Sequence, residues 1–146
     1  MKQIKTIDCV QVYDLLKSAS LGRMAAADKI SVIKTLRAMR SVAEAFTDFR
    51  SDASQRLRGE NHDKMAHLAQ LWQQREDAIS PSEKAAVKAY YDEYARNLRD
   101  CIAEEEEKPH DIDVRQLSAD GFTHLLDANP DWTAEQIMRL EELLVE

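Results

Sequence analysis

Residues 26–59 read AADKISVIKTLRAMRSVAEAFTDFRSDASQRLRG, with no proline and a single glycine at the end. Apolar side chains recur here every three or four residues, the spacing that places them on one face of an α-helix. The stripe consists of Ala26, Ile30, Ile33, Leu36, Met39, Val42, Ala43, Phe46, Phe49, Ala53 and Leu57. It predicts a helix of about 30 residues, roughly 45 Å long. Such length favours one arm of a hairpin or bundle.

Glycine and proline are scarce throughout the chain. Its 146 residues include three of each, against roughly ten and seven at average usage. The tight turns of a many-stranded sheet need these residues, so the composition argues against a sheet-rich fold. At this length the sequence predicts a single helical domain spanning residues 1–146.

Further helices are located by their expected ends. Thr6 suits the cap of a helix that runs to about Ala19, with Gly22 ending it in left-handed geometry. Asn61 can cap a helix with apolar residues as far as Ile79. The remaining start signals are Ser80-Pro81-Ser82-Glu83, Ser118 before residues 119–128, and Thr133-Ala134-Glu135-Gln136.

Two short segments alternate in the manner of strands, residues 2–5 and Ile112–Arg115. The predicted fold is therefore all-α or nearly so. It is a long antiparallel helical hairpin or bundle with short C-terminal helices and room for one two-stranded patch. The expected hairpin seam consists of Ile33, Leu36, Phe46, Phe49, Tyr90, Tyr94 and Leu98.

Charge is distributed unevenly along the chain. The net charge is −7, yet residues 21–58 hold 8 basic and 4 acidic residues, whereas residues 92–146 hold 5 basic and 16 acidic ones. Nucleic-acid binding through the basic face of helix 26–58 is an alternative prediction. Because no aromatic residues alternate with the basic ones, we favour a solvated face or one packed beside acidic segments of the same or a neighbouring subunit.

Glu104-Glu105-Glu106-Glu107 lies at a predicted helix C-terminus, where four carboxylates oppose the helix dipole. A hydrated helix end is the favoured interpretation, and docking of a basic partner and binding of a metal ion are the alternatives. The candidate interaction surface therefore consists of Arg37, Arg40, Glu104, Glu105, Glu106 and Glu107.

No catalytic constellation is complete. Glu107-Lys108-Pro109-His110 has Glu-x-x-His spacing, but Pro109 interrupts the turn and a second copy is missing. The same acidic run leaves an all-α magnesium-dependent nucleotide pyrophosphohydrolase as an alternative, although no matching acidic pair occurs on a facing helix. We predict a non-enzymatic protein with no catalytic, cofactor-binding or metal-binding residue.

Two cysteines, Cys9 and Cys101, have apolar neighbours at helical spacing. We expect both to be buried free thiols in a reducing cytosol. The N-terminus MKQIKTIDCV lacks the apolar core of a signal peptide, and no stretch approaches the roughly 20 apolar residues of a membrane span. The predicted location is the cytoplasm, without membrane contact.

Four segments carry a resemblance: MKQIKT at the start, LLKSASLGRMAA from Leu15, YYDEYARNLRDCIAEEEEKPHDIDVRQL from Tyr90, and AEQIMRLEELLVE from Ala134. Their order resembles a family of small helical proteins encoded by tailed phages and prophages. The resemblance implies a role in virion assembly or host interaction, with no functional residue to transfer. We therefore expect a helical protein–protein interaction or assembly module that binds another protein or a second copy, a dimer being favoured.

Overall fold

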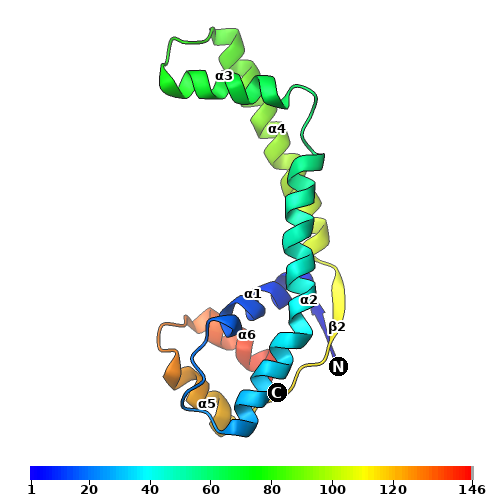
Figure 1. Ribbon diagram of the computed structural model, residues 1–146, viewed down its shortest axis with the longest axis vertical. Helices are drawn as coiled ribbons and strands as arrows, with labels where there is room; N and C mark the ends of the chain where they lie inside the picture. The colour runs from blue at the N-terminus through cyan, green and yellow to red at the C-terminus, as the bar shows by residue number, and fades with distance from the viewer. Residues whose placement is uncertain (146) are drawn as a thin grey trace. The chain divides into compact units, whose positions relative to one another are not determined.

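The computed structural model describes residues 1–145 and confirms the nearly all-α fold. Its elements are β1 (Lys2–Lys5), α1 (Thr6–Lys17), α2 (Ala26–Arg56), α3 (His62–Gln74), α4 (Pro81–Glu106), β2 (Pro109–Ile112), α5 (Ala119–Ala128) and α6 (Ala134–Leu144) (Figure 1). The chain forms two compact units. The first contains Met1–Thr47 and Glu106–Glu146, and the second contains Asp48–Glu105.

The two strands form an antiparallel pair in the first unit. The register places Lys2 opposite Ile112, Gln3 opposite Asp111, Ile4 opposite His110 and Lys5 opposite Pro109. A two-stranded patch is thus confirmed, but β2 begins three residues before the predicted Ile112–Arg115 segment. The backbone N–H of Thr6 donates to the Lys108 carbonyl at 2.9 Å, which fixes the register. In that register the first residue of β1, Lys2, lies opposite Ile112, so residues 113–115 have no partner in β1.

The predicted capping residues of α1, Thr6 and Gly22, are wrong. The cap position is Lys5, which makes no side-chain capping bond, and the helix begins at Thr6 itself. The Thr6 hydroxyl donates instead to the Lys108 carbonyl at 3.0 Å and lies 2.8 Å from His110 Nε2. The helix ends at Lys17, before Gly22, and no glycine in residues 1–145 has a positive φ. Thr6 therefore attaches α1 to the segment that leads into β2.

The three later start signals are confirmed. Ser80 and Glu83 bond reciprocally, with backbone-to-side-chain distances of 2.8 and 3.1 Å. These bonds from Ser80 lower the pKa of Glu83. The Ser118 hydroxyl accepts from the Gly121 N–H, and Thr133 forms a capping box with Gln136. By contrast, Asn61 precedes α3 without a capping bond, and α3 ends at Gln74, which leaves Ile79 beyond it.

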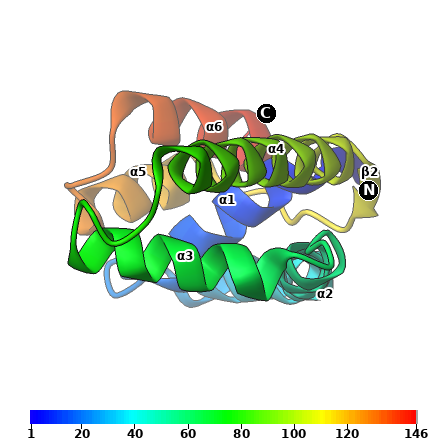
Figure 2. The same cartoon turned by 90° about the horizontal axis from the view of Figure 1, so that it is seen from above.

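The core of the first unit is built around α1, which lies between α2 and α6 when viewed as in Figure 2. The Cys9 thiol contacts the Met39 carbonyl of α2, and Asp8 faces Arg139 of α6. The core side chains include Cys9, Val12, Leu16, Val32, Met39, Leu125, Leu140 and Leu144, each no more than 1% exposed. Burial of this apolar surface is the main force that holds the unit together.

The buried face of α2 differs from the prediction near the helix start. Ile30 is 53% exposed and Ile33 is 38% exposed, so neither belongs to the core, and Ile33 is not a seam residue. Val32 and Thr35, which were not part of the predicted stripe, are buried completely, as is Met39, which was part of it. Thr35 is tolerated inside because its hydroxyl accepts the backbone N–H of Arg115 at 2.9 Å.

In the second unit, aromatic side chains of α4 contact the end of α2 and the start of α3. The Tyr94 hydroxyl donates to the Ser54 carbonyl, and the Tyr90 hydroxyl hydrogen-bonds His62 Nδ1. The rings of Tyr90 and Tyr91 meet edge-on with centroids 5.2 Å apart. No residue of α3 is fully buried, so aromatic and hydrogen-bonding contacts attach this helix rather than a deep core.

The buried face of α2 makes a direct prediction for stability. Replacing Met39 by Ala removes a fully buried side chain and should lower the free energy of unfolding by about 2–5 kcal/mol. Ile30→Ala, on the exposed face, should cost less than about 1 kcal/mol. Urea denaturation followed by circular dichroism measures both values, and equal losses would contradict the assignment of faces.

The two cysteines should react very differently. Burial raises the pKa of the Cys9 thiol to about 11, whereas Cys101 is only half-buried. Because the thiolate is the reactive species, Cys9 should resist Ellman's reagent in the folded protein while Cys101 reacts. Cys101→Ser should abolish the native reaction, and Cys9→Ser should leave it intact. Rapid labelling of Cys9 in folded Cys101→Ser protein would contradict this expectation.

Candidate interaction surface

An open groove in the first unit runs between β1, α1 and α6 and has a volume of about 720 Å³. Ile4, Val12 and Leu143 contribute its apolar lining. Met138 of α6 also lines the groove and is 64% exposed, although a large apolar side chain gains little by facing water. Because Ile4, Val12 and Leu143 are themselves buried, Met138 is the apolar side chain that the groove offers to a binding partner.

Charged side chains also line this groove. Arg139 of α6 lies 4.0 Å from Asp8 and 3.5 Å from Glu135, so it links α6 to α1. Lys2 donates to the backbone carbonyls of Glu142 and Leu143, at 3.2 and 3.1 Å. A cation at these last carbonyls of α6 complements the negative end of the helix dipole. These charged groups hold the walls of the groove together.

The predicted basic residues Arg37 and Arg40 both lie on the exposed face of α2. Arg40 Nε contacts Glu44 Oε1 at 2.8 Å, one helical turn further along, and this bond raises the pKa of Arg40. Arg37 forms no ion pair with any residue in 1–145. Arg37 is therefore the more available of the two for a partner.

The four predicted glutamates do not form one patch within a single unit. Glu104 and Glu105 belong to the second unit, whereas Glu106 and Glu107 belong to the first. α4 ends at Glu106, and Glu107 lies 2.7 Å from the Lys5 amine, which raises the pKa of Lys5. Both side chains of this pair are largely exposed, so the pair adds little stability.

Sequence reasoning missed the exposed apolar residues Ile30, Ile33 and Met138. Both isoleucines were assigned to the apolar stripe of α2, because the spacing of that stripe allows two alternative faces before Leu36. Met138 was left out of the apolar face formed by Ile137, Leu140 and Leu144. A signal was present, since Met138 is the one large apolar residue among the solvent-facing positions of α6, where Glu135, Glu141 and Glu142 are its neighbours.

Within residues 1–145, no three His, Cys, Asp or Glu side chains gather where they could bind a metal ion. In the same part of the chain, no helix combines the length and the apolar character that spanning a bilayer requires.

Comparison of the chain with protein-family models, curated proteins and solved structures gives no match. The resemblance to phage-encoded helical proteins therefore stays a prediction.

The exposure of Met138 can be checked by oxidation. Dilute peroxide should convert Met138 to the sulfoxide well before Met24 and Met39, which are 5% and 0% exposed, because oxidation requires access to the sulfur. Peptide mass spectrometry resolves the three sites. Protection of Met138 equal to that of Met39 in dilute protein would contradict an open groove.

Proposed function

We propose that this protein is a non-enzymatic helical module that acts through protein–protein contacts. The observation that carries the proposal is the exposure of Ile30, Ile33 and Met138 on helices whose opposite faces are packed into a well-formed core. The formation of the core does not require these three side chains to be exposed to solvent. Apolar side chains exposed in this way favour association with another protein.

Nucleic-acid binding is the alternative that the basic residues of α2 support. Lys34 and Arg37 are exposed on one face, as phosphate contacts require. However, the same face carries Ile30 and Ile33, which have no role in phosphate binding. The mixture of apolar and basic side chains is more typical of a protein interface.

The magnesium-dependent pyrophosphohydrolase remains a second alternative with less support. Its proposed ligands were the carboxylates of Glu104–Glu107, and Glu107 is engaged with Lys5. No observation in the described part of the chain favours the enzyme over the interaction module.

We further propose a cytoplasmic assembly role, as the resemblance to phage-encoded proteins implies. The half-buried free thiol of Cys101 is compatible with a reducing compartment.

A photo-crosslinking amino acid at position 33 or 138 tests the interaction proposal. In an extract of the cells that make this protein, illumination should yield a defined adduct with a protein at either position. Ile30→Glu should reduce the adduct at position 33, because a buried carboxylate would destabilise the contact. The same photo-crosslinking residue at position 96, on the exposed surface of α4, is the matched control.

The outcomes separate the candidate functions. A higher yield of protein adducts at position 33 or 138 than at the control position 96 supports the protein–protein interaction module. Adducts that nuclease removes would support nucleic-acid binding instead, and equal yields at all three positions would refute an interaction through these faces.

A further inference from the structure

We infer that the partner of this surface is a second copy of the same chain, bound with the exposed face of α2 against the exposed face of α6. This inference rests on the proposed function and names its partner. The two faces are defined as the basic stripe, Ile30, Ile33, Lys34 and Arg37, and the acidic stripe, Glu135, Met138, Glu141 and Glu142. All eight residues belong to the first unit.

The basic stripe is continuous along α2. At 100° per residue its four side chains fall within a narrow arc, and all four are exposed. Lys34 and Arg37 flank the two isoleucines, and neither cation forms an ion pair with any residue in 1–145. The stripe thus presents apolar surface together with positive charge that the chain itself leaves unneutralised.

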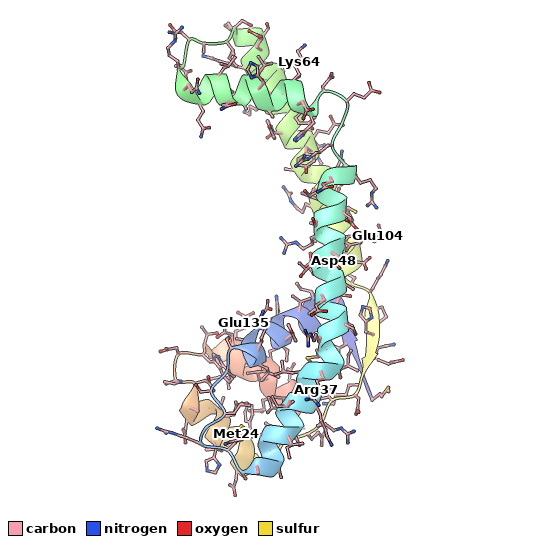
Figure 3. All side chains as sticks on the ribbon, in the orientation of Figure 1. Met24, Arg37, Asp48, Lys64, Glu104 and Glu135 are labelled. Carbon is pink, nitrogen blue, oxygen red and sulfur yellow. The ribbon has the colours of Figure 1, made fainter. Side chains whose placement is uncertain are left out.

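The acidic stripe has the complementary composition. Met138 is the apolar residue, and Glu135, Glu141 and Glu142 surround it on α6. Glu135 contacts Arg139 at 3.5 Å, whereas the carboxylates of Glu141 and Glu142 have no ion-pair partner in the described chain. Figure 3 labels Arg37 on α2 and Glu135 on α6, one residue from each stripe. The unpaired charges of the two stripes are thus equal in number and opposite in sign.

Apolar side chains are exposed on both stripes. Ile30 and Ile33 lie one turn apart on α2, and Met138 is the apolar side chain of the acidic stripe that is available to them, because Ile4, Val12 and Leu143 of the groove lining are no more than 9% exposed. The two lysines on the β1 side of the groove are engaged, Lys2 by carbonyls of α6 and Lys5 by Glu107. The unpaired charges nearest Met138 on α6 are therefore acidic.

The two stripes are different surfaces of the first unit. α1 lies between α2 and α6 in Figure 2. The basic stripe lies on the face of α2 opposite its buried residues, whereas Glu135, Met138 and Glu142 of the acidic stripe line the groove that α1 and β1 also border. The contact therefore places the basic stripe of one copy on the acidic stripe of another.

Charge reversal tests the pairing with the purified full chain. Lys34→Glu/Arg37→Glu gives each copy two acidic stripes, and Glu141→Lys/Glu142→Lys gives each copy two basic ones. Each variant should weaken self-association roughly tenfold or more, because like charges then meet at the contact. The chain with all four substitutions should regain association. The matched control is Arg96→Glu/Arg99→Glu, which makes the same charge change at the same spacing on exposed α4.

Sedimentation velocity across a concentration series measures the result, with circular dichroism to confirm folding. The wild-type chain and the control should form assemblies larger than a monomer as concentration rises, and added salt should reverse this association. A wild-type monomer at every concentration, or failure of the four-substitution chain to recover association, would each overturn the inference. Photo-crosslinks to another protein from a chain that stays monomeric would retain the proposed function while refuting this partner.

Discussion

The hydrogen bond from the Arg115 backbone N–H to the Thr35 hydroxyl allows the face of α2 that carries Thr35 to enter the core of the first unit. Thr35 is completely buried, and its hydroxyl needs a partner there because a buried polar group without one is costly. Val32 and Met39 lie one turn to either side of Thr35 and pack with α1. Once these three residues face inward, helical geometry requires Ile30, Ile33, Lys34 and Arg37 to face outward.

The same constraint links the core to the proposed function. α1 packs against α2 through Cys9 and Met39 and against α6 through Asp8 and Arg139. The helices on either side of α1 therefore turn their remaining faces to solvent. One of these faces is apolar and basic, and the other is apolar and acidic, which is the basis for proposing that one copy binds the next.

Interactions between residues close together in the sequence were predictable, whereas the face of a helix that is buried was not. The capping boxes at Ser80 and Thr133 depend on residues three positions apart, so the sequence contains the whole interaction. Thr6 has the composition of a cap, but its hydroxyl bonds Lys108 and His110, more than a hundred residues away. The burial of Thr35 could not be predicted, because a polar residue is normally assigned to the surface. Its partner Arg115 lies 80 residues away in the sequence, so no local pattern connects the two. The basic charge of Arg37 was found, but its apolar neighbours and the complementary stripe of α6 required the fold.

Cysteine labelling along α2 tests the central claim about its orientation most directly. Single cysteines at positions 30, 32, 33, 37 and 39, placed in a chain with Cys9→Ser and Cys101→Ser, would be labelled with a thiol reagent in dilute protein. Fast labelling at positions 30, 33 and 37, with protection at 32 and 39, is the predicted result. Protection at 30 and 33 with fast labelling at 32 and 39 would show that the opposite face is buried and would remove the basis for both stripes.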